Sequence, residues 1–289
     1  LVLGLIQPDE AYKVVESDLD QTICSMPLVE ALNSEAKRSS KKINIHLKVD
    51  TGMGRIGIEP NEAVGFAKRV QRYKNLNLVG VFSHFCTADS ADKTFTRTQL
   101  QRFSKVLDSL DQADIHVTIR HIANSAAVLD MPEAYLDMVR PGIMIYGLYP
   151  SNQVTHSVTL EPAMTLVTKV IAIKAVPAGT SISYGRMFIT TKKETTIASL
   201  PLGYGDGLSR LLSNKAEVLI RNTRAPLVGT ICMDMCMVDV SSLREVKCGD
   251  QVTIFGKDPS VEELAEKIGT INYEVTCNVS KRVPRVYIQ

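Results

Sequence analysis

The feature that most constrains this chain is the regular alternation of strand-like and helix-like segments through its first half. Short apolar runs are each followed by a segment with helical spacing of apolar residues, and strict alternation of this kind predicts a parallel sheet covered by helices. The predicted strands are 1–5, 21–25, 43–49, 76–83, 116–121 and 142–146, and the predicted helices are 9–16, 28–37, 62–73, 94–110 and 125–130. Residues 1–152 are therefore predicted to form an α/β unit.

The number of repeats bears on the type of sheet. A closed (β/α)8 barrel has eight units of about 30 residues, whereas six strands are visible here, and the chain opens directly on the apolar run LVLGLI without a Met. This pattern favours a TIM-type barrel whose first two βα units are missing from the chain, with residues 1–10 near the third strand of the barrel. An open doubly wound sheet needs no missing unit and stays the alternative.

The rhythm changes after Ser151-Asn152. Runs rich in β-branched residues follow one another through tight turns, which is typical of antiparallel sheets. Only 261–268 is plainly helical, with Ser260 as its N-cap and Glu263 at the capping-box position. The predicted strands are 164–176, 195–202, 217–220, 227–231, 236–240 and 251–255. Residues 153–289 are thus predicted to be a mostly antiparallel β domain.

Composition excludes several partners. The 33 basic and 31 acidic residues give a net charge of +2, which provides no field for nucleic acid or for an anionic membrane. No apolar run approaches the roughly 20 residues of a membrane helix. The six cysteines are scattered, which favours a reducing compartment, and Cys232-Met-Asp-Met-Cys236 lacks the second ligand pair of a zinc site.

Candidate chemical groups follow the predicted strands of the first half, because chemistry in a barrel gathers at the carboxyl ends of its strands. Each group also has a structural interpretation: a Gly-bearing turn, a hydrogen-bonded core histidine, a helix N-cap or a surface ion pair. The excess of cations suits a phosphate or carboxylate ligand and suits a divalent metal poorly. The candidates are Lys48, Asp50, Arg55, His84, His121, Asn124, Ser125 and Arg140.

Motifs across the whole chain resemble those of alanine racemases, which are pyridoxal-phosphate enzymes built from a barrel and a β domain. The resemblance rests on the order and completeness of the set, since any one motif is weak. The motifs are LKVDTGMGRIG (47–57), SHFCTAD (83–89), HIANSAA (121–127), MVRPGIMIYGLYPS (138–151), ISYGRMF (182–188), LPLGYGDG (200–207), GTICMDM (229–235), INYEV (271–275) and RVPRVY (282–287).

The resemblance implies interconversion of L- and D-alanine with a base on each face of the α-carbon. One base in the family is a lysine in a motif like VVKANAYGHG, which does not occur here. The expectation is that the missing leading units carry this lysine, and an inactive piece that holds the cofactor non-covalently is one of the alternatives. The other base is a tyrosine that matches Tyr184, tuned by His84 with Arg140 behind it. Arg140 is also expected to face the pyridine nitrogen of the cofactor.

The family's remaining functional positions also map onto this sequence. Ser125, Gly142, Ile143 and Tyr273 match the positions that hold the cofactor phosphate. The supporting residues are His121 and Asn124, the substrate-binding residues are Arg55, Met233 and Asp234, the entrance residue is Tyr204, and Lys48 matches a lysine that is often carbamylated.

In the family, Tyr184, Tyr204, Met233 and Asp234 would complete the site of a neighbouring subunit, which implies a head-to-tail homodimer with shared active sites. Without the resemblance, Tyr184 would be interpreted as a surface tyrosine in a hairpin. The implied protein is a cytoplasmic bacterial enzyme that supplies D-alanine for peptidoglycan and has no metal, nucleic-acid or membrane partner.

Several other functions remain open. A serine-preferring racemase of the same family is one of them, although Tyr273 agrees with alanine as the substrate. A pyridoxal-phosphate barrel decarboxylase shares the two-domain plan but places an acid where Arg140 stands. A non-catalytic pyridoxal-phosphate carrier has no counterpart to residues 160–289. A metal-dependent barrel hydrolase would need more metal ligands than Asp50, His84 and His121 supply.

Overall fold

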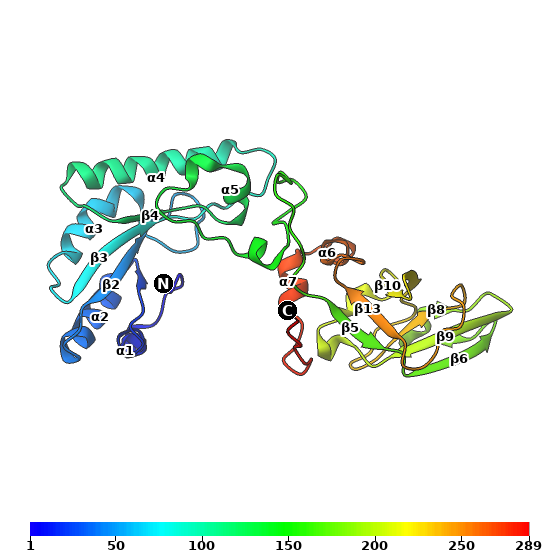
Figure 1. Cartoon of the computed structure of the whole chain (residues 1–289). Helices are drawn as coiled ribbons and strands as arrows, with labels where there is room; N and C mark the ends of the chain where they lie inside the picture. Colours follow the sequence, from blue (N-terminus) through cyan, green and yellow to red (C-terminus); the bar gives the residue numbers. More distant parts are fainter. Residues whose placement is uncertain (289) are drawn as a thin grey trace. The chain divides into compact units, whose positions relative to one another are not determined.

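A computed structural model describes residues 1–288, which form two compact units. The first unit comprises residues 1–145 and 149–159, and the second comprises 146–148 and the chain from Leu160 onward. Most helices and strands of each unit are labelled in Figure 1. No helix of the described chain is long and apolar enough to cross a membrane, and the six cysteines are free thiols.

The first unit is built on a four-stranded, wholly parallel sheet in the order β1-β2-β3-β4. The strands are β1 (Gln21–Ile23), β2 (Ile43–Lys48), β3 (Leu76–Phe82) and β4 (Ile119–His121). The helices are α1 (Ala11–Glu16), α2 (Met26–Arg38), α3 (Ala63–Val70), α4 (Thr94–Gln112) and α5 (Ser125–Asp130). Every helix predicted for this half is confirmed, within a few residues at its ends, because its apolar spacing places one face against the sheet.

Helix α2 shows how this packing works. Leu28, Val29, Leu32 and Ala36 recur at helical spacing and are fully or almost fully buried, while Lys37 and Arg38 in the last turn are exposed. Burying each large aliphatic side chain contributes about 1.5–3 kcal/mol. Packed helices of this kind fix the sheet, so that the carboxyl ends of β2, β3 and β4 lie along one edge.

Two predicted strands of this half are wrong. Residues 142–146 contain the 3-10 helix η4 (Ile143–Tyr146), and the sheet is extended there only by a single bridge between Asn124 and Arg140. The break follows Pro141, which has no N–H to donate to a ladder. Residues 1–5 contribute only a bridge from Val2 to Gln21, and the other residues of that run are all exposed.

The second unit is antiparallel throughout its strand pairings, as predicted. Its sheets have the orders β11-β10-β13-β5, β12-β9-β6 and β7-β8. The strands are β5 (Leu166–Lys169), β6 (Ala172–Pro177), β7 (Ser181–Ile182), β8 (Phe188–Ile189), β9 (Glu194–Leu200), β10 (Glu217–Ile220), β11 (Thr223–Pro226), β12 (Cys236–Asp239) and β13 (Gln251–Phe255).

Three details of the second unit differ from the prediction. The single strand predicted over 164–176 is two strands in different sheets, because the Val170 N–H donates to Asp250 while the Ile171 N–H donates to Ser199. The strand predicted over 227–231 is reduced to one bridge at Leu227, and Gly229 turns the chain with φ of 77°. The short helix α7 (Asn272–Cys277) was not predicted.

Helix α6 (Val261–Ile268) is confirmed together with its N-cap. The Glu263 N–H donates to the Ser260 hydroxyl at 3.1 Å, which satisfies one of the free N–H groups at the start of the helix. Gly269 ends the helix in the left-handed conformation at φ of 69°, as C-terminal glycines commonly do.

Candidate active site

Arg140 is the centre of a polar cluster at the carboxyl edge of the parallel sheet. Its Nη2 donates to the carbonyl oxygens of Ser83 (2.7 Å) and Ile122 (3.1 Å) and lies 3.3 Å from Nδ1 of His84. Its Nη1 donates to Nδ1 of His121. The structure therefore brings together three of the predicted site residues, and the partners of Arg140 all lie directly after β3 or at the end of β4.

Both histidines of this cluster are neutral. Burial, followed by the positive charge of Arg140, lowers the pKa of His84 to about 3 and that of His121 to about 2. Burial lowers the pKa of Arg140 to about 10, which leaves the guanidinium charged at neutral pH. Since a guanidinium only donates, the Nδ1 of His84 must accept, and the proton of His84 lies on Nε2.

The guanidinium has donors to spare. Nε–H and the second N–H of Nη1 have no acceptor among residues 1–288, whereas Nη2 is fully engaged by backbone oxygens and His84. A cation with unsatisfied donors, flanked by two uncharged imidazoles, can bind an acceptor atom without supplying a proton to it. The arrangement suits a heterocyclic nitrogen lone pair or an anion.

Lys48 lies at the end of β2 and is only 3% exposed. Burial, then repulsion from Arg140, lowers its pKa to about 7 in spite of the attraction of Asp50. Its ammonium lies 4.8 Å from the ring centre of Phe82, and the guanidinium of Arg140 lies 5.2 Å from the centre of the same ring. About half of the Lys48 amine is therefore uncharged and nucleophilic near neutral pH.

Asp50 shapes the loop that carries Arg55. Its carboxylate accepts the N–H groups of Gly52, Met53 and Gly54, each at 2.8 Å. Burial alone would raise the pKa of Asp50, but these three hydrogen bonds outweigh it and lower the pKa. Arg55 is exposed, and its charge lowers the pKa of Lys48 and of His84.

A second group of predicted residues meets beside the start of α5. The Gly142 N–H donates to the Ser125 hydroxyl at 2.7 Å, so this hydroxyl keeps its own proton free for another acceptor. Asn124 accepts the Ala127 N–H at 3.1 Å and is the N-cap of α5. Ile143 follows Gly142 directly and is buried. Ser125, Gly142 and Ile143 therefore lie together beside the start of α5.

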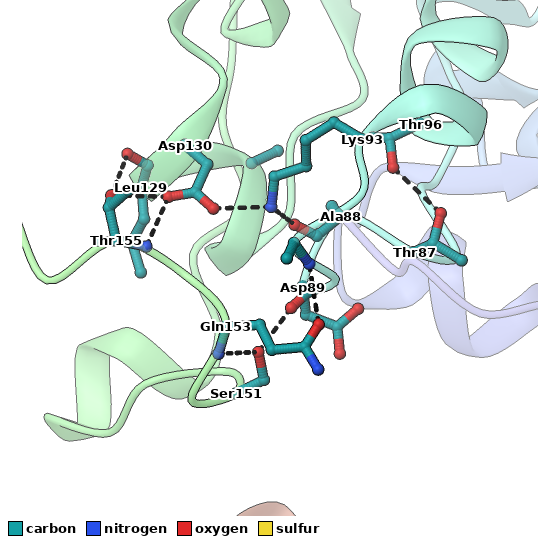
Figure 2. A network of polar contacts seen from close by, with 12 residues as sticks. Thr87, Ala88, Asp89, Lys93, Thr96, Leu129, Asp130, Ser151, Gln153 and Thr155 are labelled. Atoms are coloured by element: carbon teal, nitrogen blue, oxygen red, sulfur yellow. Dashed lines mark hydrogen bonds and ion pairs between the residues drawn. The ribbon is translucent and has the colours of Figure 1, made fainter.

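Sequence reasoning missed a polar network that fixes the loops of the site (Figure 2). Lys93 donates to Asp130 at 2.7 Å and to the Ala88 oxygen at 2.6 Å, and Asp130 also accepts from the N–H and the hydroxyl of Thr155. The Ser151 hydroxyl donates to the Asp89 oxygen. The network joins the segment after His84 to the last residue of α5, and residues so far apart in sequence carry no motif that would reveal it.

Gln99 was also missed, although its position gave a signal. It is a fully buried amide on the apolar face of α4, where a polar side chain requires partners. Its Nε2 donates to the His84 oxygen at 3.2 Å and its Oε1 accepts the Cys86 N–H at 3.1 Å. Gln99 therefore fixes the backbone on both sides of Phe85, next to His84.

The remaining predicted residues belong to the second unit, where short loops hold four of them near one another. The Ser183 hydroxyl donates to the Thr230 oxygen at 2.5 Å, and the Thr230 hydroxyl donates to the Tyr184 oxygen at 2.8 Å. The Tyr204 N–H donates to the Cys232 oxygen at 3.0 Å. The segments 183–184, 204–205 and 230–233 therefore form one connected group of loops.

This group of loops is open to solvent. Tyr184 is 71% exposed, Tyr204 44% and Met233 59%, and Asp234 is exposed as well. Gly203 is required here, since a Cβ on it would lie 2.3 Å from the Cys232 oxygen. Tyr273 lies in α7 and is half-buried. Exposed aromatic and thioether groups on a rigid loop cluster are typical of a surface that contacts another molecule.

Comparison with known proteins adds to this picture. A family model described as "Alanine racemase, N-terminal domain" matches residues 1–150, and one described as "Alanine racemase, C-terminal domain" matches residues 163–287. The chain is 49% identical over 292 residues to an alanine racemase of Desulforamulus reducens and 46% identical over 294 residues to one of Methanococcus maripaludis, in both cases spanning all of this chain and 78% of the relative.

Solved structures give the same result. An alanine racemase of Clostridium difficile has a TM-score of 0.95 at 39% identity, covering 99% of this chain and 75% of that one. An alanine racemase of Bacillus anthracis, with bound L-Ala-P, has a TM-score of 0.92 at 37% identity, covering 100% and 75%. Fold and matches together define an isomerase built from a barrel and a β domain. The chain belongs to the alanine racemase family, and racemisation of alanine is the function that this membership assigns to it.

Proposed function

We propose that the chain racemises alanine with pyridoxal phosphate held at the carboxyl edge of the parallel sheet. The observation that carries this proposal is the Arg140 cluster, in which a permanent cation with unsatisfied donors lies between two neutral histidines. When bound, pyridoxal phosphate accepts the electron pair that the departing α-proton leaves on the substrate. The residues of this chain position both molecules and move the proton.

Arg140 would donate to the pyridine nitrogen of the cofactor. The guanidinium keeps its protons at neutral pH, and neither neighbouring histidine carries a proton to give on the side facing it. The nitrogen therefore remains unprotonated. This limits how far the negative charge spreads from the α-carbon, and it disfavours side reactions such as transamination.

The cofactor phosphate would lie against Ser125, Gly142, Ile143 and Tyr273, with His121 and Asn124 supporting it. The Ser125 hydroxyl has its proton available because its oxygen already accepts from Gly142. Gly142 thus contributes by orienting this hydroxyl through its backbone N–H.

Tyr184 would take and return the α-proton on one face of the substrate. A phenol ordinarily titrates near pH 10, so it needs a coupled partner, and His84 offers Nε2–H for that purpose because its Nδ1 faces Arg140. The exposure of Tyr184, Tyr204, Met233 and Asp234 supports a head-to-tail homodimer in which these residues complete the site of the neighbouring subunit.

Arg55, Met233 and Asp234 would bind the substrate carboxylate, and Tyr204 would line the entrance. Lys48 would be carbamylated: its neutral amine nitrogen attacks carbon dioxide, loses a proton and becomes a carbamate anion. The lowered pKa of Lys48 supplies the reactive neutral amine. The anion would attract Arg55, whereas the ammonium form repels it. The expected signature is an increase in the mass of the intact chain by one carbon dioxide, which is lost on acidification.

The proposed cellular role is to supply D-alanine for peptidoglycan in the cytoplasm of a bacterium. Alanine is the proposed substrate, with serine as the second candidate. The lysine motif that provides the opposite-face base in the family does not occur among these 289 residues. The roles proposed for this chain therefore concern the cofactor, the substrate carboxylate and the Tyr184 face.

The test uses protein isolated from its natural source. We expect a yellow, borohydride-reducible cofactor and conversion of either enantiomer of alanine to the racemate, faster than for serine, with deuterium appearing at the α-carbon in heavy water. A colourless protein without racemisation would reject the proposal. Release of carbon dioxide in place of racemisation would favour a barrel decarboxylase.

A variant isolates the role of Tyr184. In Tyr184→Phe, we expect overall racemisation to be almost abolished, while α-hydrogen exchange persists for one enantiomer only, because the base on the other face is gone. Tyr12→Phe, which alters another partly exposed tyrosine, is the control and should behave like the wild type. Similar mild losses of exchange for both enantiomers would contradict a single-face base.

A further inference from the structure

A line of polar side chains crosses the interior of the first unit. Asp20 stands one residue before β1, and its carboxylate lies 3.6 Å from Nε2 of His46 in β2. Nδ1 of His46 lies 3.0 Å from Nε2 of His121, the last residue of β4. His121 in turn accepts from Arg140. Both histidines are essentially inaccessible to solvent, at 1% and 0% exposure.

This line exists because β3 leaves a gap for it. His46 is paired in register with Gly80, next to an irregularity in the β2–β3 ladder. A Cβ on Gly80 would lie 2.1 Å from Nδ1 of His46, far inside van der Waals contact. The imidazole therefore passes over the bare backbone of β3 to reach β4. His121 is held from its other side by Phe82, whose ring stacks on it at 4.6 Å and 5°.

The chemistry of the groups fixes every proton along this line. Arg140 can only donate, so Nδ1 of His121 is an acceptor and its proton lies on Nε2. That proton is donated to Nδ1 of His46, so His46 also carries its proton on Nε2, directed toward Asp20. Any other tautomer would place two donors or two acceptors against each other in a buried site. Burial lowers the pKa of both histidines, which agrees with two neutral rings.

We propose that His46, aided by Asp20 and by the gap at Gly80, is a positioning residue for Arg140: it holds His121 in the Nε2–H tautomer, so that a fixed lone pair orients the guanidinium. The consequence for racemisation rests on the proposed function. The tautomers and the orientation of Arg140 are properties of the chain itself and can be measured without an assay.

The first measurement needs no variant. In the full chain labelled with 15N-histidine, long-range proton–nitrogen correlations within each ring report which nitrogen carries the proton. We expect His46 and His121 to be neutral Nε2–H tautomers at neutral pH. The resonances are assigned by removing each of the five histidines singly, of which His116 and His156 are exposed. An Nδ1–H tautomer or a doubly protonated ring at His121 would overturn the proposal.

A matched pair of variants then tests the dependence of His121 on His46. His46→Asn can place its side-chain oxygen where Nδ1 stands, whereas His46→Leu is apolar. We expect the ring of His121 and the Nε–H signal of Arg140 to stay near their wild-type positions in His46→Asn and to shift in His46→Leu. Unchanged spectra in both variants would overturn the proposal.

A substitution in β3 tests the position of His46 by steric exclusion. Gly80→Ala should displace His46 and reproduce the spectral change of His46→Leu, while Gly65→Ala, which meets no atom within 4 Å, should not. If Gly80→Ala fails to fold, the wild-type tautomers and the two His46 variants still test whether His46 positions Arg140. A folded Gly80→Ala chain with wild-type His121 and Arg140 spectra would contradict the role assigned to this gap.

Racemisation by the natural enzyme supplies the last readout. We expect His46→Leu to lower kcat about tenfold, as losses of orienting partners commonly do, with little change in KM, and His46→Asn to restore most of the rate. Wild-type kcat in His46→Leu would reject the positioning role even where the tautomers agree. An inactive wild type with the expected tautomers would instead count against the proposed function alone.

Discussion

At the scale of single residues, the sequence does not reveal the charge states of the site residues. His84 and His121 were candidates because they end predicted strands, yet their neutrality follows from burial beside Arg140, which no local pattern reveals. Lys48 was likewise a candidate because of its place at the end of the predicted strand 43–49, and that pattern does not reveal its charge state. Its lowered pKa depends on a core that only the folded chain provides.

Lys48 should leave a signature in the pH dependence of stability. Its folded pKa is about 7, below the ordinary value near 10.4, so between these values the unfolded chain binds more protons and stability rises with pH. In buffer free of carbon dioxide, the free energy of unfolding of the wild type relative to Lys48→Met should rise between pH 7 and pH 10, by a few kcal/mol at most. If the difference in free energy of unfolding between the two chains does not change from pH 7 to pH 10, a neutral buried Lys48 is contradicted.

At the scale of elements, helices were predicted better than strands. Helical spacing in 28–37 and 261–268 is a local property, and both helices formed where expected, the second with its Ser260 cap. Strand pairing is not local. Nothing within 164–176 tells that its two halves hydrogen-bond to different sheets, and nothing in 142–146 tells that the chain coils after Pro141. The opposition of His46 and Gly80 is likewise a matter of register.

The Ser260 cap gives a modest stability prediction. Ser260→Ala removes the acceptor of the Glu263 N–H and should lower the free energy of unfolding by about 1 kcal/mol. Ser34→Ala, in an exposed position of α2, is the control and should not destabilise. Chemical denaturation of both variants measures the difference, and an unchanged midpoint for Ser260→Ala would contradict the cap.

The network of Figure 2 predicts a larger loss. Lys93→Met leaves the Asp130 carboxylate, 5% exposed, without its cation, and breaking a pair of this kind costs about 3–5 kcal/mol. Lys37→Met, on the exposed face of α2, is the matched control. Denaturation at neutral pH measures both.

The pH dependence of this loss has a definite sign. Burial raises the pKa of Asp130, but its bonds to Lys93 and Thr155 outweigh burial and lower it. The stabilisation is therefore present above the ordinary carboxyl pKa near 4 and is lost as the pH falls through the lower folded value. The difference in free energy of unfolding between the wild type and Lys93→Met should therefore become smaller in acid. A difference that does not change with pH would indicate that Lys93 stabilises the chain through packing of its aliphatic stem and not through the ion pair.

At the scale of the whole molecule, the residues proposed for one reaction are divided between two compact units. Arg140, His84 and Lys48 lie in the first unit, and Tyr184 and Tyr204 lie in the second. The sequence predicted this division from the change of rhythm after Ser151-Asn152. The proposal that one copy of the chain completes the site of another concerns the assembly, and the sequence supports this proposal only through family resemblance.

Complementation tests the shared sites. In a head-to-tail dimer, a chain carrying Tyr184→Phe and a chain carrying Arg140→Ala can form one intact site from the two unaltered residues. After the two inactive natural enzymes are mixed and reassorted, activity should recover to roughly a quarter of the wild-type value, because about half of the dimers are mixed and each has one good site. No recovery, with mixed dimers shown by mass, would contradict sites shared between subunits.

The bare backbone at Gly80 has a historical consequence. A homologue that carries a Cβ at position 80 must lose or displace the imidazole at position 46. A homologue without that imidazole has free space over β3 that a larger side chain at position 80 can fill. Positions 46 and 80 should therefore change together in evolution. Substitutions recorded across distant descendants of the gene should show them changing together far more often than either changes by itself.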